Sequence, residues 1–359
     1  MSQNHPYHCL LVPSEAPFEL KPSSPGKGWG AFATRKISQG ALIFREKPLF
    51  VIRKPHQDIT EGDVQAAFQQ LTPSEKQQFL CLRDDNASRP FIYMTEACAE
   101  NSFAIATSNS STSSNINPAT TFHGLFLLHS RFNHSCVPNS KIPTNSTASG
   151  GETTDTIASF ATRDIVAGEE ITFCYNSDFE GRTRRERHEA LRFTCDCRAC
   201  LPGTSFQQPS DARRRLIRGL QYLTLGVDLD GRKQPDDNNN NSSASPTTVI
   251  IADPDLKKAA EEFRIPISNR FIYNLLVVYL LEEEGLLDDF MSERLVPGIV
   301  LMVAWFGTES NARIARLAMA RETWVERVCV AFALYGRADR ADDDVALMLR
   351  MLHGISVEA

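Results

Sequence analysis

The chain has 359 residues, 42% of them hydrophobic and 23% charged, and its formal net charge is -6. This length indicates two domains, or one large domain with an appendage, and enough apolar residues for a sizeable core. The acidic balance argues against a nucleic-acid coat and is compatible with basic protein partners, although ordinary solubility is its simplest interpretation.

The N-terminal stretch and the cysteines bear on the compartment. Residues 1–13 lack the apolar segment of a signal peptide, and no run of about 18 apolar residues predicts a transmembrane helix. Of nine cysteines, three lie between residues 195 and 200. A chain of this length in a reducing compartment needs no disulfides, so the clustering indicates metal binding. We therefore expect an intracellular protein, in the nucleus, the cytoplasm or both, without membrane association.

The first part of the chain is β in character. Residues 1–20 are a lead-in, and prolines and glycines then mark a turn-rich stretch over residues 22–30. Strands are predicted at residues 31–34 and 41–44, as a hairpin-like pair, and a third at residues 49–52.

A helical segment follows the strands. Helices are expected at residues 62–71, 74–82 and 93–106. The second of them has a clear start: Thr72 caps, Pro73 takes the first helical position and Glu75 can reach back. A further helix is expected over residues 121–130, and it leads directly into residues 131–140.

Residues 131–140 read Arg-Phe-Asn-His-Ser-Cys-Val-Pro-Asn-Ser and follow an apolar run. Polar side chains that enter a hydrophobic region need partners, which a ligand, a metal or nearby backbone could supply. Two later stretches bear on this choice. Residues 168–175, Gly-Glu-Glu-Ile-Thr-Phe-Cys-Tyr, include a predicted strand at 170–173, and residues 195–200 read Cys-Asp-Cys-Arg-Ala-Cys.

The remaining elements are a strand, a charged helix and a helical C-terminal region. The strand is predicted at residues 156–161 and the helix at 183–192, whereas the asparagine-rich residues 235–245 are expected to be disordered. A buried helix is predicted at residues 271–281. The arginine-rich residues 182–187 and 213–215 are better explained as solvated helix faces than as a nucleic-acid surface, because acidic residues are interspersed and the chain is acidic.

The cysteine cluster predicts a zinc site. Its C-x-C-x2-C spacing supplies three thiolates, Cys195, Cys197 and Cys200. Structural zinc sites are four-coordinate, so one ligand must come from elsewhere. Cys136 is the best candidate because it lies in the polar stretch above, and Cys174 and Cys98 are alternatives. We expect a structural role, because a closed four-sulfur site leaves no open position for catalysis.

Two other motifs carry little information alone. Lys27-Gly28-Trp29-Gly30 contains two glycines that permit positive φ and close approach to a ligand, but the same pattern predicts a simple turn before a strand. Tyr175, at the end of a predicted strand, is by itself typical of packing with a satisfied hydroxyl.

The order of the motifs is specific. Lys27-Gly28-Trp29-Gly30, Asn133-His134-Ser135-Cys136-x-Pro-Asn139, Gly168-Glu169-Glu170-x4-Tyr175 and C-x-C-x2-C together resemble the SET-domain protein methyltransferases over about residues 20–202. The cysteine cluster looks like the post-SET segment of that family. The likeness is strongest to SET proteins split by a helical insert, as in the MYND-containing branch and its fungal relatives. Residues 50–100 lack the cysteines and histidines of a MYND module, and no repeat signature occurs in residues 254–359.

The resemblance implies an α+β protein: a SET β-fold of small sheets with a helical insert and a post-SET zinc segment, followed by an α-helical C-terminal region. The expected parts are a lead-in (1–20), a SET domain (21–176) with its helical insert (58–120), a post-SET zinc segment (177–203), a linker with the disordered asparagine-rich insert (204–253) and a helical C-terminal region (254–359).

The resemblance also implies roles for individual residues. S-adenosylmethionine would be the methyl donor, with Lys27, Gly28, Trp29 and Gly30 along its methionine end. Asn133 and His134 would bind it largely through backbone groups, Phe193 would stack on its adenine, and Tyr175 would be the active-site tyrosine. Zn²⁺ would be held by Cys136, Cys195, Cys197 and Cys200.

The implied activity is methyl transfer to a lysine amine of a histone or another protein, by a monomer without direct nucleic-acid contact. The alternative is a catalytically weak SET-fold protein that binds a protein partner or chromatin. Retention of Asn133, His134 and Tyr175 favours the enzyme.

Overall fold

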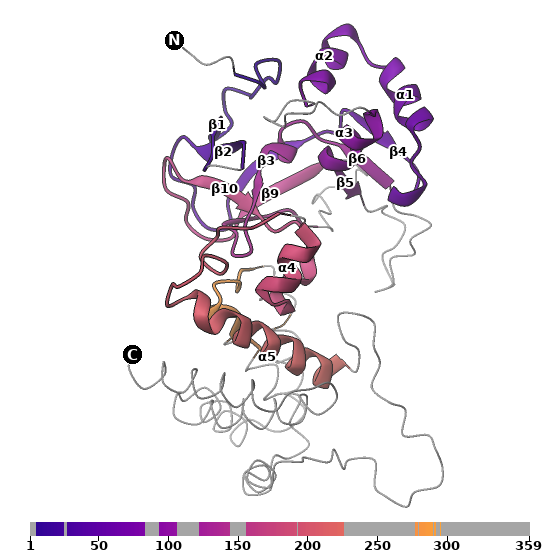
Figure 1. Ribbon diagram of the computed structural model, residues 1–359. Helices are drawn as coiled ribbons and strands as arrows, with labels where there is room; N and C mark the ends of the chain where they lie inside the picture. The colour runs from indigo at the N-terminus through magenta and orange to yellow at the C-terminus, as the bar shows by residue number, and fades with distance from the viewer. Residues whose placement is uncertain are drawn as a thin grey trace, which may run out of the picture. The chain divides into compact units, whose positions relative to one another are not determined.

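The computed structural model in Figure 1 describes most of the N-terminal two thirds of the chain and a short part beyond it. The described residues are 5–24, 27–82, 93–105, 122–143, 156–191, 193–225, 277, 278, 280–289, 291 and 295. The expected disorder at residues 235–245 and most of the expected C-terminal helices lie outside this part of the chain. The chain divides into two units, Met1–His134 with Pro138–Phe173, and Ser135–Val137 with Cys174–Ala359.

The described residues of the first unit form three small β-sheets. One has the order β1-β2-β10-β7, from Phe18–Pro22, Trp29–Ala33, Glu170–Phe173 and Asn133–His134. The second has the order β3-β9-β8, from Leu42–Glu46, Ile157–Ala161 and Ser140–Lys141. The third has the order β4-β6-β5, from Phe50–Ile52, Phe122–Leu125 and Ser102–Ile105. Together with the helices below, these sheets confirm the expected α+β class.

The hairpin-like pairing predicted around residues 35–40 is wrong. Strands form close to the predicted positions, but β2 and β3 belong to different sheets. Ala31 of β2 pairs with Leu20 of β1 on one side and with Ile171 of β10 on the other. Because both edges of β2 are occupied, β3 pairs antiparallel with β9 instead.

Where the structure describes the expected insert, it contains three helices of the first unit: α1 at Glu61–Gln69, α2 at Pro73–Cys81 and α3 at Met94–Asn101 (Figure 1). The predicted start of α2 is confirmed, because Thr72 Oγ1 accepts from the Glu75 amide at 3.3 Å and Glu75 Oε2 accepts from the Thr72 amide at 2.8 Å. The helix predicted over residues 93–106 was too long, since the chain continues from α3 directly into β5.

The helix predicted over residues 121–130 is also wrong. Its first half is strand β6, and its second half contains a short 3-10 helix at His129–Arg131. Gly124 of β6 pairs with Val51 of β4 and with Phe103 of β5. A short apolar run is compatible with helix or strand, and here the hydrogen-bonding partners on both sides decide for strand.

Aromatic side chains build the core of the first unit beside the four-stranded sheet. Phe18 and Phe132 are buried and their ring centroids lie 5.2 Å apart in an edge-to-face arrangement. Phe18 makes a similar contact with Phe44 at 5.4 Å. Such pairs stabilise a core beyond their buried area. Because Phe132 precedes Asn133, this packing anchors the start of β7.

The described residues of the second unit form helices and irregular segments. It contains a 3-10 helix at Ser177–Gly181, α4 at Arg184–Leu191 and α5 at Gln207–Leu225. The charged helix predicted at residues 183–192 is confirmed as α4. Within the described part of the chain, no helix has both the length and the apolar character that crossing a membrane requires.

Candidate active site and metal centre

The four-stranded sheet brings together three of the motif stretches. Gly30 lies on β2, Glu170 on β10, and Asn133 and His134 form β7. Strand β10 is hydrogen-bonded to β2 on one side and to β7 on the other. Residues that are far apart in the sequence therefore meet on neighbouring strands, and β10 lies at the centre of the group.

Asn133 connects all three of these strands through its side chain. Its Nδ2 donates to Glu170 Oε1 at 2.7 Å and to the Trp29 carbonyl oxygen at 3.2 Å. Both amide hydrogens of Asn133 are thus used within the protein. The next residue, His134, is only 2% exposed and pairs with Phe173 of β10.

The two glycines of the Lys27-Gly28-Trp29-Gly30 stretch are each required, for different structural reasons. Gly28 has φ of 71°, a conformation that disfavours residues with a side chain. Gly30 has no room for a side chain, because a Cβ there would lie 2.8 Å from Asn133 Nδ2 and still closer to Glu170 Oε1. Lys27 precedes the strand in a turn where its amide donates to the Ser24 carbonyl oxygen at 3.0 Å.

Asn139 attaches the end of the polar stretch to the same strand. Its Oδ1 accepts from the Thr172 amide at 2.8 Å, and its Nδ2 donates to the Glu170 carbonyl oxygen at 2.8 Å and to Glu169 Oε1 at 2.9 Å. Glu169 also accepts from Arg163 at 2.5 Å and from the Val166 amide at 3.1 Å. Burial raises the pKa of Glu169, but these hydrogen bonds and the charge of Arg163 outweigh it and the net pKa is lowered.

Glu46 positions the segment that leads into β7, and sequence reasoning did not find it. Its carboxylate accepts from the amides of Leu127, Leu128 and His129 at 2.7–2.8 Å and contacts His129 Nδ1 at 2.8 Å. The other ring nitrogen of His129 lies 3.2 Å from Ser159 Oγ. Glu46 is on β3, 81 residues before Leu127, so no local sequence pattern could reveal the contact.

Tyr175 and Phe193, two predicted site residues, lie in the second unit. Their rings meet edge to face, with centroids 6.5 Å apart and planes inclined by 75°. Tyr175 is 44% exposed and Phe193 43% exposed. Large aromatic side chains with this exposure, in contact with each other, can accept a planar or apolar ligand.

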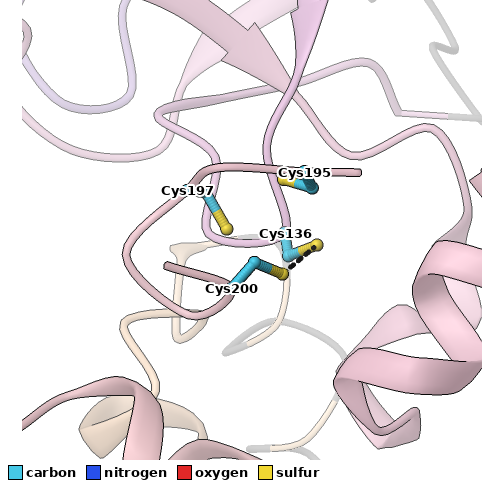
Figure 2. A group of neighbouring side chains, drawn as sticks. All are labelled: Cys136, Cys195, Cys197 and Cys200. Atoms are coloured by element: carbon cyan, nitrogen blue, oxygen red, sulfur yellow. Dashed lines mark hydrogen bonds between the residues drawn. The ribbon is translucent and has the colours of Figure 1, made fainter. Parts of the chain in front are cut away.

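The second unit also brings together the four predicted zinc ligands (Figure 2). The sulfur atoms of Cys136, Cys195, Cys197 and Cys200 all lie within 4.8 Å of one another. In a tetrahedral zinc site with Zn–S bonds of about 2.3 Å, thiolates lie about 3.8 Å apart, and Cys136 and Cys200 have their sulfurs at 3.6 Å. Three of the four side chains are buried. The donor set and its spacing therefore fit a four-sulfur metal centre.

A buried arginine lies beside the four thiols. Hydrogen bonds with Cys195, Cys197 and Cys200 raise the pKa of the Cys136 thiol, whereas bonds from the other three thiols lower the pKa of Cys197. The fully buried Arg187 on α4 donates to Cys200 Sγ at 3.3 Å. A buried cation beside sulfur favours the charged thiolate.

The expectation that residues 213–215 form a solvated basic face is wrong for two of the three arginines. Arg213 and Arg214 are buried and both bind Glu284, at 2.7 and 2.9 Å. Arg214 also donates to the Cys136 carbonyl oxygen at 2.9 Å. A buried charge needs a partner, and Glu284 is distant in sequence, so the arginine run alone did not reveal the pairing. In the run of residues 182–187, Arg185 is exposed as expected, whereas Arg187 is fully buried and the expectation is wrong for it.

Comparison with known proteins agrees with this arrangement. Residues 28–176 match the SET domain family model. The histone-lysine N-methyltransferase set5 of Schizosaccharomyces pombe is 31% identical over 198 residues, which cover 54% of each chain. The protein-lysine N-trimethyltransferase SMYD5 of Danio rerio is 42% identical over 83 residues, which cover 22% of this chain and 19% of SMYD5. The chain thus spans about half the length of the first relative, and a smaller share of the second.

The fold of small sheets, the strand neighbourhood around β10 and the family match define one class of domain. That class is the SET domain, whose family model residues 28–176 match.

Proposed function

We propose that the protein is a protein-lysine N-methyltransferase that uses S-adenosylmethionine. The observation that carries the proposal is the coincidence of the SET-domain match with the four-stranded sheet, where β2 and β7 flank β10. The match covers Gly28 to Gly30, Asn133, His134 and Tyr175. The names of the fission-yeast and zebrafish relatives describe lysine methyltransferases, which supports the same class of reaction.

The residues present fit the methyl donor. S-adenosylmethionine, when bound, supplies an electrophilic methyl group on a sulfonium. The backbone of Lys27, Gly28, Trp29 and Gly30 would line its methionine end, with the positive φ of Gly28 shaping the turn. Since both amide hydrogens of Asn133 are used by Trp29 and Glu170, Asn133 and His134 would bind the donor through backbone groups.

Tyr175 and Phe193 would act on substrate and cofactor respectively. Phe193 would stack on the adenine, and the Tyr175 hydroxyl would orient the lysine amine and stabilise the transition state. The amine must be neutral to attack, and an exposed lysine has a pKa of about 10.4. Desolvation beside the sulfonium would lower this pKa. Alignment of the amine with the methyl group contributes further, because it removes translational and rotational freedom before the reaction.

Zinc would have a structural role in this scheme. Cys136, Cys195, Cys197 and Cys200 would occupy all four positions of a tetrahedral ion, which leaves none for substrate. Arg187 and Arg214 would offset the excess negative charge of four thiolates.

The substrates would be lysine side chains of histones or other proteins, in the nucleus or cytoplasm. We propose that the protein acts as a monomer and recognises protein rather than nucleic acid. The burial of Arg213 and Arg214 in ion pairs supports the last point, because it removes two of the basic residues that a nucleic-acid surface would use.

The proposal is tested by incubating the full chain with labelled S-adenosylmethionine and a protein extract, followed by mass-spectrometric mapping of labelled sites. We expect label on lysine, reduced on the order of 100-fold in Y175F, which lacks the positioning hydroxyl. Y93F removes another exposed tyrosine hydroxyl in the first unit and should leave labelling unchanged.

Calorimetry of cofactor binding separates the two main explanations of a negative result. Binding of S-adenosylmethionine without any labelling would favour the catalytically weak, partner-binding alternative. No binding heat and no labelling would overturn the proposed enzyme. Equal labelling by Y175F and the unsubstituted chain would remove Tyr175 from the mechanism.

A further inference from the structure

A second group of metal-ligating side chains lies in the first unit, apart from the four-cysteine cluster. The ligand atoms of His8, Cys9 and Cys81 all lie within 4.8 Å of one another. His8 and Cys9 come from the N-terminal segment, and Cys81 is the last residue of α2. Cys9 and Cys81 are both free thiols in hydrogen-bonding contact with each other.

The N-terminal side of this group is held in place by buried neighbours. Tyr7 and Leu10, which flank His8 and Cys9, are 1% and 7% exposed and belong to the core of the first unit. The Leu10 amide donates to the Tyr7 carbonyl oxygen at 2.9 Å and closes the turn. Arg131 lies over the Tyr7 ring at 4.5 Å. The turn therefore presents its two ligand residues with little conformational freedom to lose.

The α2 side is anchored in the same way. Phe79 and Leu82, on either side of Cys81, are 0% and 1% exposed. Both are part of the same core as Tyr7 and Leu10. Because both segments are fixed by packing, the three ligands are held close together before any ion binds, which lowers the cost of assembling a site.

The hydrogen bonding of His8 prepares its ring for a metal. His8 Nδ1 lies 3.0 Å from the carbonyl oxygen of His5. A carbonyl oxygen can only accept, so Nδ1 carries the hydrogen and Nε2 of the neutral ring keeps its lone pair. Metal-bound histidines characteristically donate their second ring N–H to a backbone carbonyl or a carboxylate in this manner. This hydrogen bond is an observation separate from the proximity of His8, Cys9 and Cys81, and it also indicates metal binding.

We propose that His8, Cys9 and Cys81 bind a thiophilic divalent cation of the zinc class. Two thiolates and one imidazole are a zinc donor set, and a tetrahedral ion with three protein ligands keeps one position for solvent. His8 is exposed and the two cysteines are partly exposed, so the ion can reach the site from solution. The bound ion would tie the N-terminal segment to the end of α2 in the helical insert.

The test is a Co²⁺ titration of the full chain after purification with a reductant and removal of metals with a chelator. Charge-transfer and ligand-field absorption report thiolate-bound cobalt. We expect the unsubstituted chain to take up about one ion per chain more than C9S/C81S. Because the result is a difference, it holds whether or not the four-cysteine cluster also takes cobalt. C197S alters only the four-cysteine cluster. The same difference in cobalt uptake should therefore appear between C197S and C9S/C81S/C197S.

A histidine substitution gives a second and milder test. H8Q should weaken binding of this ion on the order of tenfold or more, because even loss of groups behind the ligands costs that much. H56Q removes another exposed histidine of the first unit and should change nothing. If C9S/C81S does not fold, as judged by circular dichroism, H8Q decides alone, since the His8 side chain is exposed.

Two results would overturn the proposal. One is metal binding that the substitutions leave unchanged: equal cobalt uptake by the unsubstituted chain and C9S/C81S, or an H8Q variant that binds cobalt as tightly as the unsubstituted chain. The other is a disulfide between Cys9 and Cys81 in protein isolated with thiols blocked at lysis. Such a bond would consume both sulfur ligands and leave His8 without a role.

Discussion

Asn133 Nδ2 lies 2.7 Å from Glu170 Oε1, so the first asparagine of the polar stretch is bound to the glutamate of the neighbouring strand β10. The same Nδ2 donates to the Trp29 carbonyl oxygen on the other flanking strand. One side chain thus holds together the three strands that carry the proposed cofactor-binding residues of the first unit.

This contact predicts the effect of N133D. The substitution replaces two N–H donors by a carboxylate that faces the Glu170 carboxylate and a carbonyl oxygen. We expect a loss of about 1–3 kcal/mol in the free energy of unfolding, because paired acceptors are left without a donor. Urea denaturation at neutral pH measures it. The double variant N133D/E170Q returns a donor to the pair and should recover part of the loss. If it is no more stable than N133D, the Asn133–Glu170 contact does not carry the effect.

Gly30 is expected to tolerate no side chain. In G30A the new Cβ would meet Asn133 Nδ2 and Glu170 Oε1, so both groups must move. We expect destabilisation of about 1–3 kcal/mol, as for overpacking in general, and weaker binding of S-adenosylmethionine by calorimetry. G62A is the matched control. Gly62 lies in α1 with only Thr60 Oγ1 nearby, at 3.8 Å, so alanine there should be neutral or slightly stabilising. Equal stability of G30A and G62A would show that the sheet adjusts without cost.

The four-cysteine cluster predicts a loss of metal in C197S. Zinc content by elemental analysis should fall by about one ion per chain relative to the unsubstituted protein, because three sulfurs no longer close the site. C174S is the control, since Cys174 packs against the cluster but is not one of its four ligands. Unchanged zinc in C197S would exclude the assignment.

C136S should lower zinc content in the same way and also weaken cofactor binding, because Cys136 follows His134 by two residues in the chain.

Glu169 predicts a specific dependence of stability on acid. Its pKa is lowered in the folded protein from the ordinary value of 4.5. A lowered folded pKa stabilises the fold above the ordinary value, and this contribution is lost as the pH falls from there through the folded pKa. E169Q should therefore be less stable than the unsubstituted protein at neutral pH, and its stability should fall less steeply below pH 4.5.

The control for this pH dependence is E19Q. Glu19 forms an exposed ion pair with Lys21. Thermal unfolding from neutral to acidic pH measures the stability of each variant relative to the unsubstituted protein. This difference in stability should shrink with acid only for E169Q. Parallel curves for E169Q and the unsubstituted protein would contradict the assignment.

Much of the local structure could be read from the sequence because the interactions that make it are local. The start of α2 rests on a cap between Thr72 and Glu75, three residues apart, and the sequence shows both partners. The C-x-C-x2-C spacing likewise places three thiols within reach of one ion. The order of the motifs was enough to indicate a SET domain, which the family match confirms.

The remaining features of the structure depend on contacts between residues that are distant in the sequence. The residues alone left three candidates for the fourth sulfur, and the fold brings Cys136 to the other three. Glu284 pairs with Arg213 and Arg214 across about 70 residues, which turned an expected solvated face into a buried one. Strand β6 forms because β4 and β5 pair with its two edges. Strand β2 has β1 and β10 on its two edges, so β3 pairs with β9 instead. Local patterns record what a residue prefers among its neighbours, whereas pairing, burial and charge compensation are set by the tertiary structure, because their energies depend on partners that the sequence does not place.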